Sequence, residues 1–341
     1  DIYQKKTTDL LISRNLPGSA GFSSTYYNQA SLNNKGVEFS LNAQVIDSSS
    51  WKWSVSGNIG VNRNEISDLG LLPADFGCLG ERVGYYGNSL GDHFGVGHIF
   101  LAGEAPGLFY GYVTQGIVQK EDITENGIKY IKQDGSVGYY QTVNKTTPVA
   151  GDVKYVDRNG DGVVDDNDRD IIGNPNPDFT YGFQTKVSWK SLSLSASFNG
   201  VQGRDILNVG NRYNNTPGTK SNNVTRKAFQ NMWTDENPSN LYPKSTFVVQ
   251  NMVMDRYVED GSYLRCSDIT LSYILPAKWT NKIGIKNTSV YASVKNAFVI
   301  TDYSGYDPEV NSFAFDGLRP GVDMNSYPTP RSFVFGLNLT F

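Results

Sequence analysis

Residues 157–168 form the stretch of this sequence whose residue types and spacing point most clearly to chemistry. They read Asp-Arg-Asn-Gly-Asp-Gly-Val-Val-Asp-Asp-Asn-Asp. An EF-hand loop places oxygen ligands at positions 1, 3, 5, 7, 9 and 12, with a glycine at position 6. Gly162 takes the sixth position here, and the ligand positions hold Asp157, Asn159, Asp161, the carbonyl of Val163, Asp165 and Asp168. Because calcium prefers such an anionic, all-oxygen set, the sequence predicts a calcium site.

Two features of this acidic loop depart from an EF-hand. Asp168 replaces the usual Glu at position 12, as in dockerin-type loops, and its shorter side chain is expected to reach an ion with only one oxygen. Gly173-Asn-Pro-Asn-Pro177 follows and leaves little room for a second helix. The alternative is a polar loop that holds itself by side-chain-to-backbone hydrogen bonds. Calcium would have a structural role, because nothing nearby supplies a nucleophile or a base.

Other residue types that commonly do chemistry are few. His93 and His98 are the only histidines, their spacing matches no common metal or catalytic arrangement, and we expect both on the surface. Cys78 and Cys266 form no CxxC motif, so they are either a disulfide in an oxidising compartment or two separate thiols, in a loop and on a strand. The sequence contains no recognisable catalytic triad or phosphate-binding glycine loop, and we predict that the protein is not an enzyme.

The elements that must position the acidic loop are strands with one apolar and one polar face. The last eleven residues show this alternation most clearly, with apolar residues at Phe333, Phe335, Leu337, Leu339 and Phe341 and one exception on the other face, Val334. The same two-residue period recurs at 37–45, 51–61, 179–189, 192–198, 269–273 and 290–300. Successive side chains in a strand point to opposite faces. The segments run to roughly ten to fourteen residues, which suits a tilted bilayer crossing better than a globular strand.

The connections between these segments fall into two size classes. Residues 47–50, 190–191 and 276–284 are short, whereas 67–107, 204–260 and 301–330 are long and rich in Gly, Asn and Pro. Outer-membrane barrels have short periplasmic turns and long extracellular loops. Four of the five tryptophans lie in or beside the short turns, namely Trp51, Trp53, Trp189 and Trp279. An aromatic girdle at the periplasmic interface is therefore expected there, the alternative being core tryptophans of a soluble β protein.

One long connection has further features. Residues 221–233 are compatible with a short helix. Tyr213, Trp233 and Tyr242 are candidates for contact with a ligand or a partner, although aromatic loop residues also serve in ordinary packing.

Composition narrows the classes of protein. The 341 residues are only 38% hydrophobic but contain 35 Gly, 21 Tyr and 17 Phe. The sequence has no run of eighteen or more apolar residues, so it predicts no transmembrane helix. The net charge of −4, with signs interspersed, argues against binding to nucleic acid. Residues 1–6 lack the apolar core of a signal peptide, so we expect a mature product or, preferably, a fragment of an exported protein.

Several stretches resemble the SusC/RagA-type TonB-dependent outer-membrane transporters of Bacteroidetes. They are Phe109-Tyr-Gly-Tyr-Val-Thr-Gln-Gly-Ile117, Gly151-Asp-Val-Lys-Tyr-Val-Asp-Arg-Asn-Gly-Asp-Gly162, Ile172-Gly-Asn-Pro-Asn-Pro-Asp-Phe179, Tyr303-Ser-Gly-Tyr-Asp-Pro-Glu-Val310 and Tyr327-Pro-Thr-Pro-Arg-Ser-Phe333. The resemblance covers the chain from about residue 33 to its end. It implies an all-β fold, an antiparallel transmembrane β-barrel with long extracellular loops. Residues 1–341, with the calcium-type loop 151–177 inserted, would form the carboxy-terminal half of a barrel of about twenty-two strands.

The resemblance also implies a function and partners. Such transporters import glycan or peptide oligomers across the outer membrane, together with a SusD-like surface lipoprotein and often as a dimer of such pairs. TonB would act through a plug and an amino-terminal barrel half that are absent from this chain, and the lipid bilayer would surround the strands. The periplasmic carboxy-terminus would put the acidic loop outside the cell. The alternatives are a barrel of this family that serves as a structural component of an outer-membrane complex, and a soluble calcium-stabilised β adhesin.

Overall fold

The computed structural model describes residues 1–340 apart from 16–18, 20, 23, 71–77, 80–81, 91–93, 217–222, 246–251, 281–284 and 286. Phe341 and His93, on which two of the predictions fall, lie outside the described residues. In the part that is described, no helix is long and apolar enough to cross a membrane.

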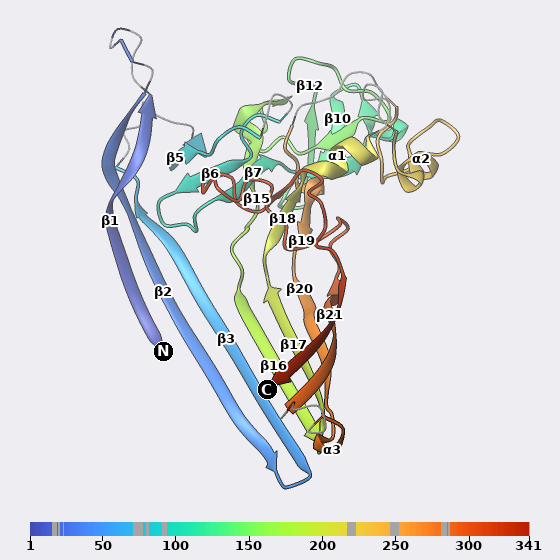
Figure 1. Cartoon of the computed structure of the whole chain (residues 1–341). Coiled ribbons are helices and arrows are strands. Elements are labelled where there is room, and N and C mark those ends of the chain that lie inside the picture. Colours follow the sequence, from blue (N-terminus) through green and yellow to red (C-terminus); the bar gives the residue numbers. More distant parts are fainter. Residues whose placement is uncertain are drawn as a thin grey trace.

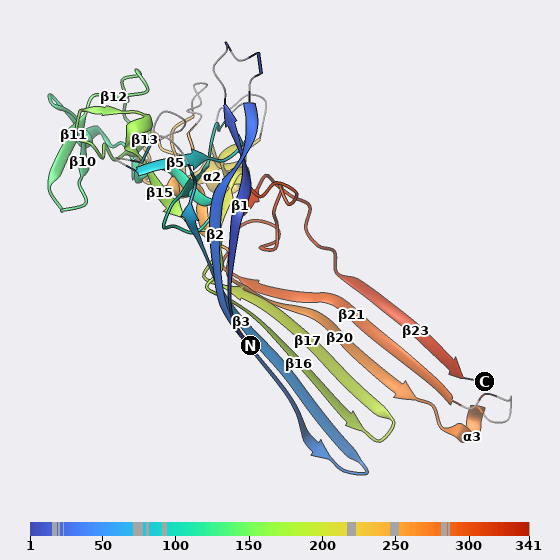
Figure 2. The same cartoon turned by 90° about the vertical axis from the view of Figure 1, so that its left-hand side faces the viewer.

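Eight long strands form one antiparallel sheet, which we call the wall (Figures 1 and 2). Its order is β1-β2-β3-β16-β17-β20-β21-β23, so each strand pairs with the wall strand that precedes it in sequence. The bounds are β1 Ile2–Asn15, β2 Ser24–Asp47, β3 Trp51–Asp68, β16 Phe179–Trp189, β17 Leu192–Gln202, β20 Tyr263–Ile274, β21 Asn287–Thr301 and β23 Ser332–Thr340. The all-β prediction is confirmed.

The structure keeps the predicted alternation through the wall and adds strand length that the pattern did not show. β1 and the first half of β2 were not predicted, because apolar residues there do not alternate cleanly. β20 begins at Tyr263, six residues before the alternating segment 269–273 starts. A register shift between Cys266 and Asp268 explains this difference, since a β-bulge interrupts the two-residue period.

Cross-strand pairs between tyrosine and glycine stabilise the wall at three places. The pairs are Tyr3 with Gly36, Tyr181 with Gly200, and Tyr291 with Gly336. Each ring lies over its glycine, and a Cβ added to any of the three would come within 2.3 Å of ring atoms. Only glycine fits beneath these rings, so the tyrosines cover sheet positions that would otherwise be bare backbone.

Three connections of the wall that were predicted to be short lie at one end. β2 and β3 are joined through residues 48–50, and β16 and β17 through Lys190 and Ser191, where Lys190 adopts a positive φ of 51°. α3 (Ala277–Thr280) lies between β20 and β21 at the same end (Figure 1). The long connections between wall strands β3 and β16, β17 and β20, and β21 and β23 leave from the opposite end. β1 ends and β2 begins at that opposite end too, so the predicted short and long connections lie at opposite ends but the β1–β2 connection adds a short one to the end of the long ones.

The three long connections fold together into a second region, which we call the cap: residues 69–178, 203–262 and 302–331, in the described part. Its strands are β4 Cys78–Leu79, β5 Arg82–Tyr86, β6 His98–Leu101, β7 Leu108–Tyr112, β8 Thr114–Ile117, β9 Ile123–Thr124, β10 Gly127–Ile131, β11 Val137–Tyr140, β12 Thr142–Val143, β13 Val153–Tyr155, β14 Val163–Val164, β15 Arg169–Gly173, β18 Asp205–Asn208, β19 Val258–Asp260 and β22 Val322–Asp323. Its helices are η2 Lys120–Asp122, η3 Asp166–Asp168, α1 Val209–Asn215, α2 Arg226–Asn231 and η4 Asp255–Tyr257.

The cap has a core of its own. Aromatic side chains dominate it, and Tyr110, Tyr130, Tyr140, Tyr155 and Phe109 are each at most 1% exposed. The hydroxyl groups of these tyrosines find partners inside the cap; that of Tyr130, for example, donates to the Asp157 carbonyl at 2.6 Å. The short sheets of the cap therefore pack as a water-soluble domain does, with apolar bodies inside and polar tips paired.

Candidate functional site

The acidic loop lies in the cap, between β13 and β15. Asp157 is 2% exposed, and its two carboxylate oxygens accept the backbone N–H groups of Gly160 at 2.6 Å and Gly162 at 2.9 Å. Gly160 and Gly162 both have positive φ, near 76° and 87°, which lets the chain turn tightly around this carboxylate. The sequence thus folds the loop around Asp157.

Asp168 closes the loop from its other end. It is fully buried, and its carboxylate accepts the backbone N–H groups of Arg158 at 2.7 Å, Asn159 at 3.3 Å and Asp165 at 2.8 Å. Burial raises the pKa of the Asp168 carboxyl, and the nearby charge of Asp157 raises it further, against the lowering effect of the three backbone donors. Asp168 is therefore a structural anchor of the loop.

The remaining predicted ligands are also engaged in local hydrogen bonds. Side-chain oxygens of Asn159, Asp161 and Asp165 accept the backbone N–H two residues ahead, at 2.9, 2.8 and 2.8 Å. Val163 belongs to β14, and a strand, β15, follows the loop where an EF-hand has its second helix. The described residues, which include all six predicted ligands, contain no group of three or more His, Cys, Asp or Glu side chains that could hold a metal ion. This geometry fits the self-held loop better than a formed calcium site, and calcium stays a prediction.

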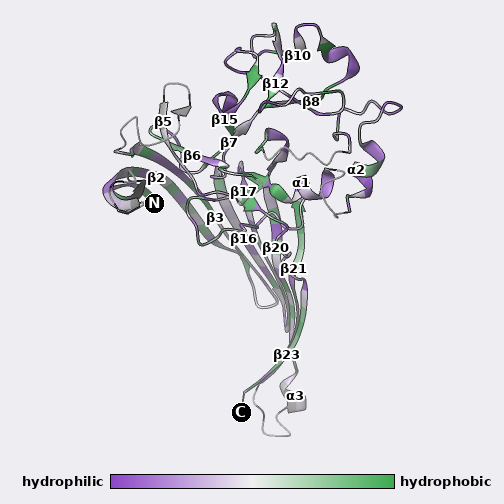
Figure 3. Ribbon diagram, turned by 90° about the horizontal axis from the view of Figure 1, so that it is seen from above, coloured by the Kyte–Doolittle hydropathy of each residue, from purple (hydrophilic) through white to green (hydrophobic). Residues whose placement is uncertain are grey.

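The outward face of the wall carries many exposed apolar side chains. Large apolar side chains on it are between about a third and four-fifths exposed, including Phe39, Leu41, Ile59, Phe183, Leu194, Leu271, Phe333, Phe335, Leu337 and Leu339. Hydrophilic and hydrophobic residues alternate along the strands (Figure 3). An exposed patch of this size on a folded protein marks contact with another apolar phase or partner.

This apolar band has two recognisable borders. At the end of the short turns, Trp51 and Trp189 are register partners with ring centroids 6.0 Å apart, and Trp279 on α3 is 66% exposed. At the cap end, the paired residues Val37 and Val61 are followed on the same face by Lys35 and Arg63. Ten strand positions separate Trp51 from Val61, or roughly 33 Å at about 3.3 Å per residue. With a tilt of about 40°, the band is roughly 25 Å tall, the height found in outer-membrane barrels.

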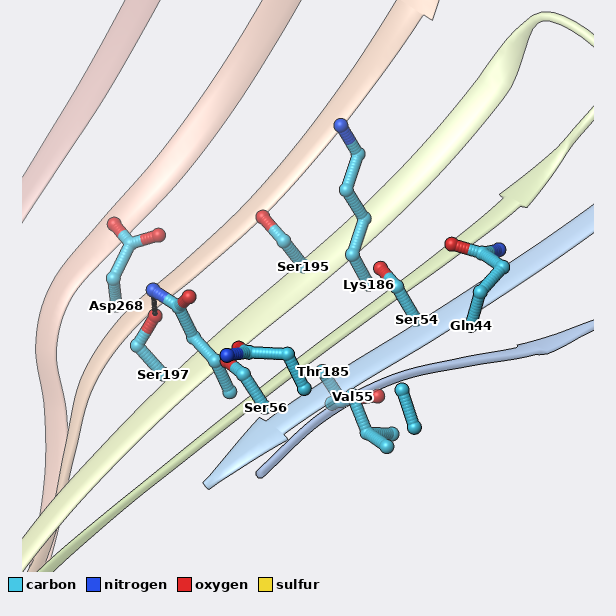
Figure 4. A pocket seen from close by; sticks show the side chains of 12 residues that line it. Gln44, Ser54, Val55, Ser56, Thr185, Lys186, Ser195, Ser197 and Asp268 are labelled. Atoms are coloured by element: carbon cyan, nitrogen blue, oxygen red, sulfur yellow. Dashed lines mark hydrogen bonds between the residues drawn. The ribbon is translucent and has the colours of Figure 1, made fainter. Parts of the chain in front are cut away.

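The opposite, inward face is polar and concave. One concavity of about 540 Å³ is lined by Asn42, Ala43, Gln44, Ser54, Val55, Ser56, Gln184, Thr185, Lys186, Ser195, Ser197 and Asp268 (Figure 4). A second, of about 680 Å³, adjoins it towards the cap and shares Ser197 and Gln184. The few charges are partly neutralised: Asp268 pairs with Lys295 at 2.6 Å and accepts the hydroxyls of Ser293 and Thr270. The face presents mainly neutral amide and hydroxyl groups.

The structure corrects the prediction for His98 and bears on the two alternatives for the cysteines. His98 is not on the surface; it is fully buried, and its Nε2 lies 2.9 Å from the Pro320 carbonyl. Burial lowers the pKa of His98 to about 4, so the neutral ring donates from Nε2. Cys266 is a buried free thiol on β20, which agrees with the alternative of two separate thiols. Nothing in the sequence around His98 marks it as buried, except its place in the apolar run 98–101.

The predicted helix of the long connection forms in a narrower range, as α2, with Thr225 as its N-cap. Trp233 is only 8% exposed, and its Nε1 donates to Gln119 at 3.1 Å. Tyr213 packs edge-on against Phe94, at 6.1 Å between ring centroids. Packing therefore accounts for both of these aromatic residues.

Comparison of the sequence with curated proteins places the chain among TonB-dependent receptors. It is 32% identical over 348 residues to TonB-dependent receptor P26 of Formosa agariphila, covering 99% of this chain and 32% of that protein. It is also 32% identical over 351 residues to the TonB-dependent receptor SusC of Bacteroides thetaiotaomicron, covering 100% of this chain and 30% of that protein. No family model matches the sequence.

The fold gives the same result. The structure of the RagAB peptide transporter superposes on this chain with a TM-score of 0.69 at 26% identity, covering 100% of this chain and 33% of that chain. The architecture is thus that of a TonB-dependent barrel transporter, a class of protein that is not an enzyme. By homology over its whole length, the chain belongs to the SusC/RagA-type TonB-linked outer-membrane proteins, and it spans about a third of the length of the relatives it matches.

Proposed function

We propose that the protein works as part of a TonB-dependent importer in the outer membrane, and that the wall is the membrane-spanning sector of its barrel. The observation that carries this proposal is the apolar band of roughly 25 Å between the tryptophans at the short turns and the first charged row, Lys35 and Arg63. On this view the short turns are periplasmic, the cap is extracellular, and the inward face lines the passage. The rest of a barrel of about twenty-two strands, with a plug and the segment that contacts TonB, completes the importer.

The cargo that we propose is a glycan or peptide oligomer. Its support comes from the relatives, which include a SusC and a peptide transporter, and from the neutral amide and hydroxyl groups of the inward face. Such groups hydrogen-bond to sugar hydroxyls and to peptide amides alike. A SusD-like surface lipoprotein, and dimers of such pairs, are the partners that this function would use.

A pair of adjacent substitutions tests the membrane assignment. Phe183 is 45% exposed in the middle of the band, at the level of Gly57, and Gln184 is its neighbour on the inward face. An arginine at mid-depth on a lipid-facing position costs about 2–4 kcal/mol, whereas an inward position tolerates it. In the full-length protein we expect Phe183→Arg to lower the yield of folded barrel in outer membranes several-fold, measured by heat-modifiable gel mobility. Gln184→Arg should leave the yield unchanged, and equal yields for the two variants would contradict the assignment.

Import itself is tested in the organism that makes the protein. Deleting the gene should abolish uptake of a labelled oligosaccharide or peptide pool, and inactivating TonB should cause the same loss. The molecules that co-purify with the intact complex identify which pool to use. If the deletion instead left all uptake intact and disrupted the assembly of an outer-membrane complex, the barrel would be a structural component and not an importer.

A further inference from the structure

Two sequence motifs that carry the family resemblance, 303–310 and 327–333, meet at one residue of the cap. The carboxylate of Asp307 is almost completely buried, and its Oδ1 receives Arg265 Nη2 at 2.5 Å and the backbone N–H of Glu309 at 3.0 Å. Its Oδ2 accepts the backbone N–H of Thr329 at 3.1 Å. Asp307 thus joins both motifs to Arg265, whose side chain is 6% exposed.

Arg265 fixes this junction to the inward face of the wall. Arg265 on β20 is the register partner of Asn199 on β17, which belongs to the polar face. Glu309 reaches both, with Oε2 at 3.3 Å from Arg265 Nε and Oε1 accepting Asn199 Nδ2 at 3.0 Å. Arg204 donates to the Pro308 carbonyl from the same side. The Asp-Pro-Glu turn is therefore held against two neighbouring wall strands by charged contacts shielded from water, where such contacts are strong.

The same connection is held again at a distant place. Asp316 accepts Arg319 Nε at 2.7 Å and Asn88 Nδ2 at 2.8 Å, and Arg319 Nη1 donates to the Ser89 carbonyl at 2.9 Å. Leu318 packs with Ile66, Leu69 and Phe100. Ile66 pairs with Leu32 on the inward face of β2 and β3, just beyond the last polar pair of that face, Asn34 and Asn64.

The two anchors lie on different parts of the curved wall. In strand order, β16 and β17 lie between β3 and β20. The connection leaves β21, turns at Asp307 against β20 and β17, and continues to the β5–β6 region beside β3 (Figures 1 and 2). On its return it pairs with the cap, because Val322 of β22 lies parallel to Leu207 of β18. Residues 303–319 therefore span the inward side of the curved wall directly, from the anchor at β17 and β20 to the anchor beside β3.

We propose that residues 303–319 form a brace that closes the cap end of the inward face over β16, β17 and β20, and that the Arg265–Asp307 ion pair is the lock that holds the brace there. Molecules from the cap side then reach the two concavities only by passing around the brace. If the proposed import function is correct, the brace excludes cargo from this sector of the passage and keeps the curvature of the wall constant.

The lock can be tested by chemical access to the inward face. Ser197 lines both concavities and lies two residues from Asn199, below the brace. In outer-membrane vesicles that contain the full-length protein, a membrane-impermeant maleimide added outside should label Ser197→Cys slowly. Adding Asp307→Ala, or Arg319→Ala at the other anchor, should raise the labelling rate about tenfold. All variants carry Cys78→Ser, and the protein without Ser197→Cys gives the background, since Cys266 is buried.

A matched control is the Arg63–Asp178 ion pair, in which Arg63 Nη2 and Asp178 Oδ1 are 2.8 Å apart but which lies on the exposed, outward side. Arg63→Ala should leave the labelling rate of Ser197→Cys unchanged. Asp307→Asn, which keeps the side-chain shape, replaces Asp307→Ala if that variant does not fold. Rapid labelling with the brace intact, or equally slow labelling after the lock is broken, would overturn the proposal. Labelling measures no import, so a brace that responds as expected stands even if the proposed cargo uptake fails.

Discussion

The wall and the cap place the same residue types in opposite surroundings. Phe335 on β23 is 79% exposed, whereas Phe109 on β7 is completely buried. Aromatic side chains of the cap core pack against one another, whereas Phe39, Phe333 and Phe335 of the wall are exposed on its outward face. Residue type alone thus does not decide burial; the surroundings of each region do, which are water for the cap and, in the proposed membrane arrangement, lipid for the wall.

The largest expected difference between the two regions is in stability, when a phenylalanine in each is replaced by alanine. Phe109→Ala should destabilise the cap by about 3–5 kcal/mol, because it removes a buried ring and leaves a cavity beside His98, whose ring centroid is 5.3 Å away. Phe335→Ala should change the stability of the wall by about 1 kcal/mol or less, since lipid fills the space and no cavity forms. Hydrogen exchange reads the local opening of each region separately. Equal losses at the two positions would mean that the outward face is packed against protein.

A smaller effect concerns pH and is confined to the cap. Burial, and then the positive charge of Arg319, lower the pKa of His98 to about 4, against the raising effects of the Pro320 carbonyl and Asp316. The unfolded side chain, with a pKa near 6.5, binds a proton first as the pH falls. The stability that the neutral ring contributes is therefore complete above pH 6.5 and is lost progressively towards pH 4, by roughly 2–3 kcal/mol.

The variant His98→Gln should flatten this pH dependence, because glutamine keeps a donor for the Pro320 carbonyl and does not titrate. Hydrogen exchange of β6 and β7 between pH 7 and 4 provides the measurement. The wall should show no corresponding change, and a pH dependence that persists in His98→Gln would assign it to another group.

The smallest expected effect is that of calcium on the acidic loop. Its carboxylates already have backbone partners, so an ion adds to an existing structure and does not create it. At ten times its Kd, calcium would stabilise the loop by about 1.4 kcal/mol. We predict that EDTA increases protease cleavage within residues 157–168 and that Asp157→Asn abolishes the response. Cleavage that is insensitive to both calcium and EDTA would leave hydrogen bonds as the only support of the loop.

The sequence predicted the wall well and the cap poorly, for a physical reason. In the wall each residue faces one of two uniform phases. The alternation along 179–189 or 332–340 is therefore enough to predict that a strand forms, which face each residue lies on and where the strand ends. Cap strands are two to five residues long, and their faces depend on contacts between distant segments, as between Tyr112 and Asp166. No local period encodes such contacts. For the same reason the burial of His98 was missed.

The candidate sites divide in the same way. The spacing of residues 157–168 identified the tight loop, because its hydrogen bonds join residues two to ten positions apart, as between Asp157 and Gly160. The Asp-Pro-Glu turn was visible only as a motif. Its partner Arg265 lies 42 positions away, so the role of Asp307 needed the fold.

The order of strands in the wall has a consequence for how the protein is made. β2–β3 and β16–β17 are hairpins that can close locally, but β3 and β16 join residues 120 positions apart, as at Gly60 and Thr180. All of residues 69–178 lie between them, and closing a chain of that length is slow and exposes two unpaired edges in the meantime. The seam between β3 and β16 is therefore the step at which assembly would stall, and where a folding chaperone in the periplasm would have most to protect.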